Sequence, residues 1–252
     1  MMTTVYSPSP ISMDSPWRWL GAGWRDLWAA PVQSIGYGLV IVGGGFLIIY
    51  GLWKAHLAAL IPVALGVFAL IGPLLALGLY EASRRQAAGE APGLYPVRFE
   101  TPRAPEQIAY IGFFLLFAAL VWVLLAMGLY AIVTAGSYMP LDRFVEFALT
   151  TPQGLTMLVV GTLVGGAVAF AIYLLTVVSI PMLMNEKVDA FTAIGAGLRA
   201  FKSSPGTMLL WAWLIGILIV GGVATMFVGL AVIFPLLGHA TWHAYRDIRA
   251  AV

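Results

Sequence analysis

Two histidines four residues apart are the side chains of this sequence best placed to do chemistry. His239 and His243 lie in the segment Gly238-His-Ala-Thr-Trp-His-Ala-Tyr245, and residues at this spacing share one face of a helix. Neutral imidazoles placed in this way can bind a metal ion. The chain has no cysteine to complete a thiolate site, and Asp247 lies one turn beyond the pair. A metal site at His239 and His243 would therefore need further ligands, from residues 185–189.

The same histidines also have a purely structural interpretation. His and Trp side chains are common where a transmembrane helix leaves the bilayer, and this interpretation needs no metal. A nucleophilic pair of Ser179 and His239 is a further possibility, but the sequence offers no group to orient the histidine and no oxyanion donors. The sequence thus identifies no catalytic residues and no cofactor.

The composition around these histidines is that of a membrane protein. Only 10% of the residues are charged and 61% are hydrophobic, whereas soluble proteins carry about 25% charged residues. Four runs free of Asp, Glu, Lys and Arg reach the roughly 20 residues that cross a bilayer once. A fifth run, residues 207–242, has 36 residues and suits two short spans that turn near Gly221-Gly222. We therefore predict an all-α membrane protein with six transmembrane helices in three hairpins, at residues 35–80, 108–184 and 207–245.

An internal repeat precedes the first and third hairpins. Gly21-Ala-Gly-Trp-Arg-Asp-Leu-Trp-Ala-Ala-Pro31 aligns with Gly195-Ala-Gly-Leu-Arg-Ala-Phe-Lys-Ser-Ser-Pro205. The apolar residues of each copy recur at steps of three and four, which predicts amphipathic helices at residues 15–30 and 189–203. Ser15 and Asp189 are the expected N-caps. The apolar stripes are Trp17, Leu20, Trp24 and Leu27 in the first copy, and Val188, Phe191, Ile194, Leu198 and Phe201 in the second.

These two helices are too short and too charged to cross a bilayer, so we expect them to lie in its interface. Arg25 and Arg199 mark their charged side, and Pro31 and Pro205 end each helix and turn the chain into the membrane. We call each such helix and its proline corner an elbow. A docking site for a partner protein or a lipid headgroup is a second interpretation of the elbows.

A proline lies near the end of the second span of each hairpin. Pro73, Pro181 and Pro235 each remove a backbone donor and are expected to kink their helices. Each kink frees a carbonyl that a neighbouring helix, water or a Ser/Thr side chain must satisfy. Clustered glycines, at residues 43–45, 161–166 and 216–222, are typical of close helix packing in membranes.

The distribution of charge predicts the orientation. Of the 13 Lys and Arg residues, 11 lie in the N-terminal segment, the loop 86–107 and its borders, the segment 185–204 and the C-terminal tail. With six spans these segments share one side, which the positive-inside rule makes cytoplasmic. We expect a multi-pass protein of the bacterial inner membrane with both termini inside, a disordered stub at residues 1–14 and an irregular loop at 86–107. The net charge of +2 does not indicate a nucleic-acid partner; the expected partners are the lipid bilayer and other membrane proteins or a second copy.

Three segments carry a resemblance to a known family. The stretches from Val178 to Ala193, from Ser204 to Trp211 and from Pro235 to Tyr245 resemble an uncharacterised bacterial family of predicted integral membrane proteins, some labelled putative cytochrome c oxidase subunit I. The resemblance implies no established activity. The oxidase label does not suit a catalytic subunit, because three histidines are too few for two haems and a copper.

Three functions remain open from the sequence. The first is a non-enzymatic accessory, assembly or scaffolding component of a membrane complex, for example a respiratory one, which the absence of charge within the spans favours. The second is a transporter or a protein that handles lipid or small solutes, since repeats and interrupted helices are common in transporters. The third is a metal-handling protein that uses His239 and His243.

Overall fold

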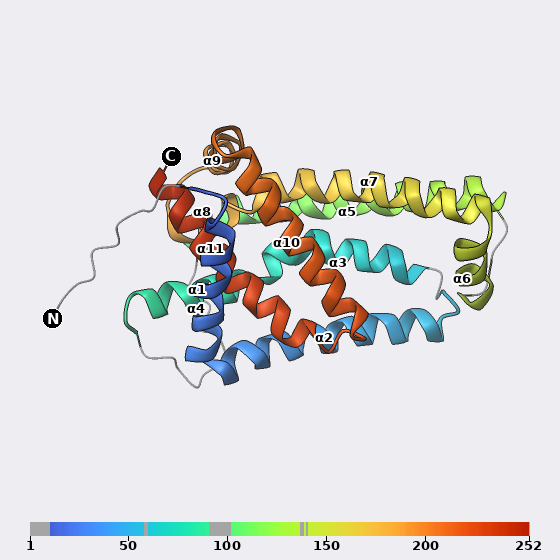
Figure 1. Ribbon diagram of the computed structural model, residues 1–252, viewed down its shortest axis with the longest axis horizontal. Coiled ribbons are helices and arrows are strands. Elements are labelled where there is room, and N and C mark those ends of the chain that lie inside the picture. The colour runs from blue at the N-terminus through green and yellow to red at the C-terminus, as the bar shows by residue number, and fades with distance from the viewer. Residues whose placement is uncertain (1–10, 58–59, 91–101, 137–138, 140, 252) are drawn as a thin grey trace. The chain divides into compact units, whose positions relative to one another are not determined.

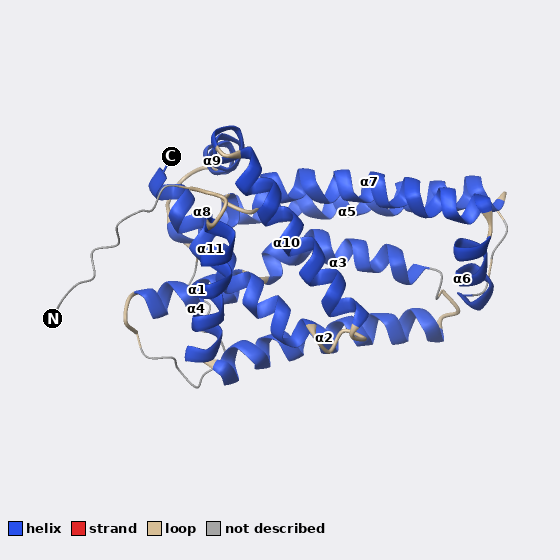
Figure 2. Cartoon of the chain, in the orientation of Figure 1, coloured by secondary structure: helices blue, strands red, loops and turns tan. Residues whose placement is uncertain are grey.

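The computed structural model describes residues 11–57, 60–90, 102–136, 139 and 141–251, and every regular element in these ranges is an α-helix (Figures 1 and 2). Most of the predicted N-terminal stub, and residues 91–101 of the predicted loop 86–107, fall outside the described residues. The helices are α1 (Ser15–Ala29), α2 (Pro31–Lys54), α3 (Ile61–Leu75), α4 (Leu77–Ala87), α5 (Pro105–Thr134), α6 (Leu141–Thr150), α7 (Pro152–Thr176), α8 (Ser179–Asn185), α9 (Ala190–Ser203), α10 (Pro205–Ala224) and α11 (Leu230–Ala251).

Five helical stretches of the described residues are long and apolar enough to cross a membrane. They are Pro31–Lys54, Ile61–Ala87, Pro105–Thr134, Pro152–Asn185 and Pro205–Ala224. The last apolar run divides into two helices, α10 and α11, but the break falls after Ala224 and not at Gly221-Gly222, which lie inside α10. Helix α11 is not among the candidate spans. The all-helical membrane class is confirmed, whereas the sixth span stays a prediction.

The chain forms two compact units. The first contains residues up to Val42, Pro73–Ile108 and Leu174–Val252, and the second contains Gly43–Gly72 and Ala109–Tyr173. Within the first unit α11 packs against α1, α4, α8 and α10 (Figure 1). The core there includes the fully buried side chains of Trp19 and Leu27 from α1 and Trp211 from α10. Trp19 and Trp211 meet edge to face with ring centroids 5.5 Å apart.

In the second unit a tryptophan fills the space that glycines leave between helices. The Trp122 indole of α5 donates to the carbonyl of Val63 on α3 at 3.1 Å. A Cβ added at Gly165 of α7 would lie 2.8 Å from the Trp122 ring, and one added at Gly66 would also clash with it. These glycines therefore permit the close helix packing that the sequence predicts. Helix α6 was not predicted, because it contains Arg143 and Glu146 and so belongs to none of the uncharged runs.

The two copies of the repeat make the same corner. Helix α1 ends at Ala29 and α2 begins at Pro31, while α9 ends at Ser203 and α10 begins at Pro205. The residue between them has nearly the same backbone in both copies, with φ −139° and ψ 64° at Ala30 and φ −142° and ψ 63° at Ser204. The internal repeat thus encodes a repeated helix–proline–helix corner.

The N-terminal caps of the two elbow helices differ. The Asp189 carboxylate accepts from the Thr192 backbone N–H at 2.9 Å, as predicted for α9. In α1 the predicted cap is wrong, because the helix already includes Ser15 and its N-cap residue is Asp14, which makes no side-chain capping bond. The Ser15 hydroxyl accepts instead from the Ser12 N–H and from Arg18.

The apolar stripe predicted for α1 divides between two faces. Leu27 is fully buried together with Trp19, whereas Trp17 and Trp24 are exposed. In α9 small residues pack inward, since Ala193 and Ala200 are fully buried. Of the predicted stripe, Phe191 is 86% exposed and Leu198 is also exposed, whereas the other members are half-buried. Each elbow helix therefore has one face packed on the protein and one apolar face left open.

Two of the three prolines, Pro73 and Pro181, lie within about one turn of a helix break. The span that contains Pro73 breaks at Ala76, between α3 and α4, and the span that contains Pro181 breaks at residues 177–178, between α7 and α8. Pro235 lies inside the continuous helix α11. Side-chain hydroxyls satisfy carbonyls near two of these sites, since Tyr37 donates to Leu75 and Ser179 donates to Leu175. The three segments that follow or contain these prolines, α4, α8 and α11, contact one another.

Candidate functional site

A connected set of polar side chains lies within the first unit. It joins Asp26 of α1, Ser34 of α2, Ser83 of α4 and both histidines of α11, and we call these five residues the His239 cluster. His239 is fully buried, and Ser34 and Ser83 are each 1% exposed. The cluster therefore connects four helices that are far apart in the sequence.

Hydrogen bonds run through the cluster without a gap. Ser34 Oγ lies 3.0 Å from His239 Nε2, and Ser83 Oγ lies 2.7 Å from His239 Nδ1. Ser83 Oγ also donates to Asp26 Oδ2 at 2.6 Å, and His243 Nε2 lies 2.8 Å from the same Asp26 oxygen.

The acceptor-only chemistry of a carboxylate fixes the direction of every bond. Asp26 must accept from both Ser83 and His243, so His243 carries its proton on Nε2. Ser83 donates its only hydroxyl proton to Asp26, so it must accept from His239 Nδ1–H. A neutral His239 then has a lone pair on Nε2, and the Ser34 hydroxyl donates to it. Every donor of these bonds then has an acceptor, and each hydrogen bond is donated in the direction of Asp26.

The environment of Asp26 favours the charged carboxylate that this order requires. Burial alone raises the pKa of Asp26, but hydrogen bonds from His243 and Ser83 outweigh it and hold the pKa below its usual value. Each charge-assisted hydrogen bond of this kind contributes about 1.5–3 kcal/mol. The cluster therefore stabilises the packing of α1 against α4 and α11.

Glycines bring the helix backbones close enough for these short side chains to meet. A Cβ at Gly23 of α1 would lie 2.6 Å from the Ala240 nitrogen of α11, and one at Gly238 would lie 2.6 Å from Leu79 of α4. A Cβ at Gly38 of α2 would overlap the carbonyl of Ala231. The second glycine of the Gly-Ala-Gly motif is thus a contact point. Its counterpart Gly197 is also a contact point, because a Cβ added there would lie 2.8 Å from the Leu174 carbonyl oxygen.

A second set of polar contacts joins α1 to the C-terminal part of α11. The Trp19 indole donates to Asp247 Oδ2 at 2.7 Å, and Arg18 Nη2 lies 3.9 Å from the same oxygen. Burial raises the pKa of Asp247 to about 6. Asp247 therefore joins α1 to α11 and does not contribute to the histidine pair.

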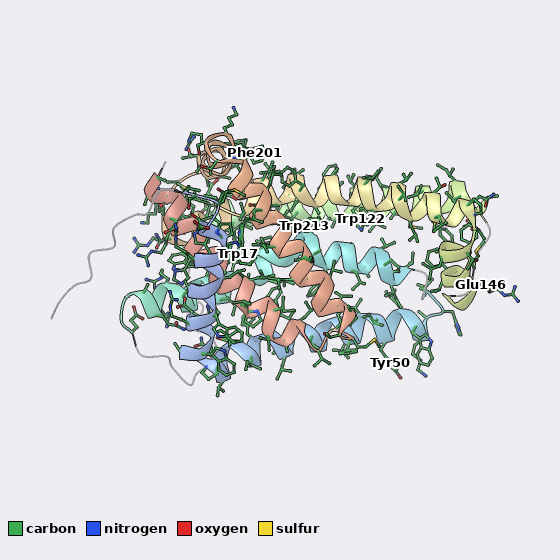
Figure 3. The ribbon with its side chains drawn as sticks, in the orientation of Figure 1. Trp17, Tyr50, Trp122, Glu146, Phe201 and Trp213 are labelled. Carbon is green, nitrogen blue, oxygen red and sulfur yellow. The ribbon has the colours of Figure 1, made fainter. Side chains whose placement is uncertain are left out.

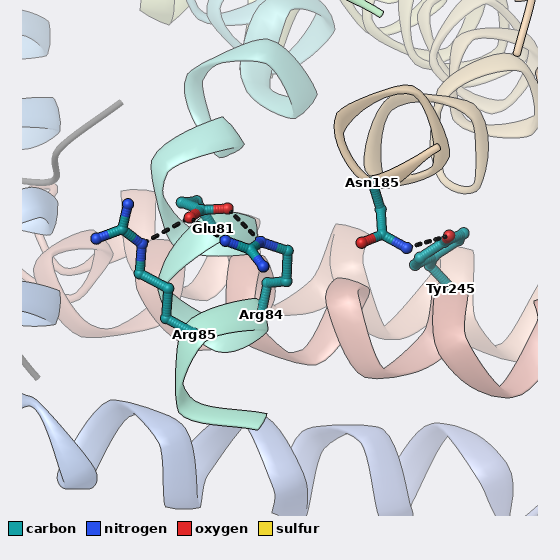
Figure 4. A network of polar contacts seen from close by, with 5 residues as sticks. All are labelled: Glu81, Arg84, Arg85, Asn185 and Tyr245. Atoms are coloured by element: carbon teal, nitrogen blue, oxygen red, sulfur yellow. Dashed lines mark hydrogen bonds and ion pairs between the residues drawn. The ribbon is translucent and has the colours of Figure 1, made fainter. Parts of the chain in front are cut away.

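The residues expected to help the histidines bind a metal are engaged elsewhere. Glu186 accepts from the Tyr245 hydroxyl at 2.7 Å and from Arg249 at 3.0 Å, and Asn185 donates to Tyr245 at 3.2 Å (Figure 4). Asp189 caps α9. Segment 185–189 thus holds the end of α11 and leaves the histidines to Asp26 and the serines.

Glu81 of α4 is likewise satisfied by its own helix. Its carboxylate accepts from Arg84 at 2.7 Å and from Arg85 at 2.6 Å (Figure 4). The hypothesis of a Ser179–His239 pair is wrong for this structure, because Ser179 donates to the Leu175 carbonyl and His239 is held by Ser34 and Ser83.

The two histidines of the predicted metal site are held by hydrogen bonds in the structure. Both ring nitrogens of His239 bond to serines, and His243 bonds to Asp26. Among the described residues no three or more His, Cys, Asp and Glu side chains form a group that could hold a metal ion. Metal binding by His239 and His243 stays a prediction, and the arrangement that is present is a hydrogen-bond network.

Sequence reasoning found the two histidines but not their partners. Asp26 belongs to the repeat motif, but the second copy has Ala200 at that position, so the comparison of copies offered a weak signal. Ser34 and Ser83 carry no sequence signal beyond being polar residues near span ends. The other predicted residues lie on the elbows: Arg25 and Arg199 are exposed, and Pro31 and Pro205 begin α2 and α10.

Comparison with known proteins agrees with the membrane architecture. A family model described as predicted integral membrane protein (DUF2189), a domain of unknown function, matches residues 60–185. The match runs from the start of α3 to the end of α8 and covers half of the chain. No curated protein and no solved structure matches the chain. The oxidase label that the resemblance carried has no support from these comparisons.

Proposed function

Because the chain belongs to the DUF2189 family of predicted integral membrane proteins, we propose that it acts in the membrane through contacts with another protein. In this proposal it is a non-catalytic accessory, assembly or scaffolding component of a larger membrane complex. Its location is the bacterial inner membrane, with both termini cytoplasmic and α11 as the sixth span. The distribution of Lys and Arg supports this orientation.

The closed His239 cluster supports a structural role for His239 and His243. Each hydroxyl, imidazole and carboxylate in it bonds to another member, and three of the five side chains are almost completely buried. A catalytic group needs a partner atom on its substrate. The hydrogen bonds of these groups instead hold α1, α2, α4 and α11 together.

An open glycine face on α2 is the observation that carries the proposal. A Cβ added at Gly36, Gly43 or Gly51 would meet nothing within 4 Å among the described residues. These glycines recur every two turns, so they share one face of the helix. Val40 and Leu47 flank them on this face and are each 74% exposed.

Glycines in membrane helices typically allow another helix to approach closely, because lipid provides no hydrophobic drive for association. Gly38, on the opposite face of α2, serves this purpose against α11. The open face has the same composition but no neighbour in the part of the chain that the structure describes. It therefore suits a transmembrane helix of a partner protein.

Purification from native membranes tests the proposal. The full chain, extracted in mild detergent, is expected to run as a discrete complex with one partner at fixed stoichiometry by native gel and quantitative mass spectrometry. A Gly43→Leu/Gly51→Leu variant fills the open face and is expected to lose the partner while keeping its own unfolding temperature.

The matched control is Gly128→Leu, at a glycine of α5 that is also open. This variant is expected to keep the partner. Recovery of only the lone chain from native membranes, or equal loss of the partner in the control, would contradict the proposal.

A transporter or lipid-handling role is the alternative that the helix breaks after Pro73 and before Pro181 favour. It predicts a lipid or solute that co-purifies with the chain in place of a protein. The mutual contacts of α4, α8 and α11 support the scaffolding role more than this one.

A further inference from the structure

The arginine of each repeat copy adopts the same position on its elbow helix. Arg25 and Arg199 are exposed, and each guanidinium folds back over the glycine four residues earlier. A Cβ added at Gly21 would lie 3.8 Å from Arg25 Nη1, and one added at Gly195 would lie 3.2 Å from Arg199 Nη1. The first glycine of the motif thus leaves room for the arginine, while the second packs against a neighbouring helix.

These two arginines differ from others in the first unit in their electrostatic partners. Arg84 and Arg85 both pair with Glu81, and Arg249 pairs with Glu186. Within the described residues Arg25 and Arg199 form no ion pair. The repeat therefore presents two positive charges that the protein itself does not neutralise.

Exposed apolar side chains lie on the same helices as both arginines. On α1 these are Trp17 (Figure 3), Trp24 and Trp28, which are 57%, 47% and 52% exposed. The Trp24 and Trp28 rings meet edge to face with centroids 5.6 Å apart. On α9 the Phe191 side chain, aligned with Trp17, is 86% exposed.

The opposite faces of both helices are already occupied. Gly23 of α1 contacts the backbone of α11, and Gly197 of α9 contacts the Leu174 carbonyl of α7. Neither helix can turn its arginine and apolar side chains inward without losing these contacts. Both helices also end at a proline corner that leads directly into a candidate span.

We propose that the two elbows are paired binding sites for anionic phospholipids, with Arg25 and Arg199 each binding a headgroup phosphate. A guanidinium presents a planar fork that matches two phosphate oxygens. The exposed tryptophans and Phe191 cover the adjoining glycerol and upper acyl region, as amphipathic helices do at a membrane interface. Charge complementarity selects the anionic lipid, because a zwitterionic headgroup carries its own compensating ammonium group. This role is separate from the protein contact proposed for α2.

Native mass spectrometry of the purified full chain measures this binding. Dioleoyl phosphatidylglycerol and dioleoyl phosphatidylcholine are titrated separately into the detergent-solubilised protein. We expect two phosphatidylglycerol molecules to bind more tightly than any phosphatidylcholine. Arg25→Gln and Arg199→Gln are each expected to weaken one of the two sites by about fivefold, since one basic residue near an anionic surface contributes about 1 kcal/mol. The double variant is expected to show no preference between the two lipids.

Two controls separate this site from general charge effects. Arg249→Gln removes an arginine that is already paired with Glu186 and is expected to leave both lipid sites intact. Inorganic phosphate, added at the same concentration as the lipid, is expected not to displace it, because the apolar contacts are lacking.

A milder variant tests the geometry without removing charge. Gly195→Ala places a methyl group where Arg199 folds back, at 3.2 Å, whereas Gly21→Ala meets Arg25 at the ordinary contact distance of 3.8 Å. We expect Gly195→Ala to weaken its site more than Gly21→Ala does. Unchanged lipid preference in the Arg25→Gln/Arg199→Gln variant, equal loss in Arg249→Gln, or displacement by inorganic phosphate would overturn the proposal.

Discussion

Replacing Asp26 by alanine removes the acceptor on which the whole His239 cluster converges. Asp26 Oδ2 accepts from Ser83 at 2.6 Å and from His243 at 2.8 Å. The substitution eliminates two charge-assisted hydrogen bonds of about 1.5–3 kcal/mol each and leaves the Ser83 hydroxyl with no carboxylate to bind. We therefore expect the free energy of unfolding to fall by about 3–5 kcal/mol.

Thermal unfolding in detergent, followed by intrinsic tryptophan fluorescence, is the assay. A chain of this size loses about 2–4 °C of melting temperature per kcal/mol, so Asp26→Ala is expected to melt on the order of 10 °C below the wild type. The matched control is Asp14→Ala, which changes an acidic residue at the start of the same helix that makes no side-chain capping bond. Its expected shift is within the scatter of ordinary surface substitutions.

A double-mutant cycle then isolates the contact itself. Ser83→Ala alone removes the bridge between Asp26 and His239 and leaves His239 Nδ1–H without an acceptor. Asp26→Ala/Ser83→Ala is expected to cost less than the sum of the two single variants by about 1.5–3 kcal/mol. Additive effects, or an Asp26→Ala shift no larger than that of Asp14→Ala, would refute the assigned hydrogen-bond order.

Three further predictions follow from the same contacts. Burial raises the pKa of Asp247 to about 6, so the folded state binds this proton more tightly than the unfolded state does. The stability that this proton contributes is lost as the pH rises from about 4 through about 6. Asp247→Asn is expected to remove up to about 2 kcal/mol of this pH dependence in melting experiments, and identical pH profiles of the two proteins would disprove the prediction. Gly38→Ala is expected to lower the melting temperature by several degrees because its Cβ would overlap α11, whereas Gly36→Ala, two residues away in open space, is expected to be neutral or slightly stabilising. The metal hypothesis predicts stoichiometric metal in the purified protein and its loss in His239→Ala/His243→Ala; the hydrogen-bond network predicts no stoichiometric metal by elemental analysis of either form.

Local sequence signals predicted the two repeated helices and their proline corners. The step of three and four residues, the Asp189 cap and the positions of Pro31 and Pro205 are features of adjacent residues, and the structure shows two helices that end at matching corners. Pro73 and Pro181 likewise lie within about one turn of a helix break, since a missing backbone donor acts locally, whereas Pro235 lies inside the continuous helix α11.

The cluster partners could not be predicted, because their contacts join distant parts of the chain. Ser34 lies 205 residues from His239, and Asp26 lies 217 residues from His243. Periodicity also could not choose between the two apolar faces of α1, since Trp19 and Leu27 form one and Trp17 and Trp24 the other. The packing of α11 decides between them, and that is a tertiary effect.

Site-specific photocrosslinking in native membranes tests the central claim most directly, the contact between the open glycine face of α2 and a partner protein. A photoreactive benzoylphenylalanine in place of Gly43 is expected to give one discrete adduct, with the mass of the chain plus one other protein. The same probe in place of Gly128, an equally open glycine of α5, is expected to give none. Absence of an adduct from the Gly43 position, or the same adducts from both positions, would contradict the account.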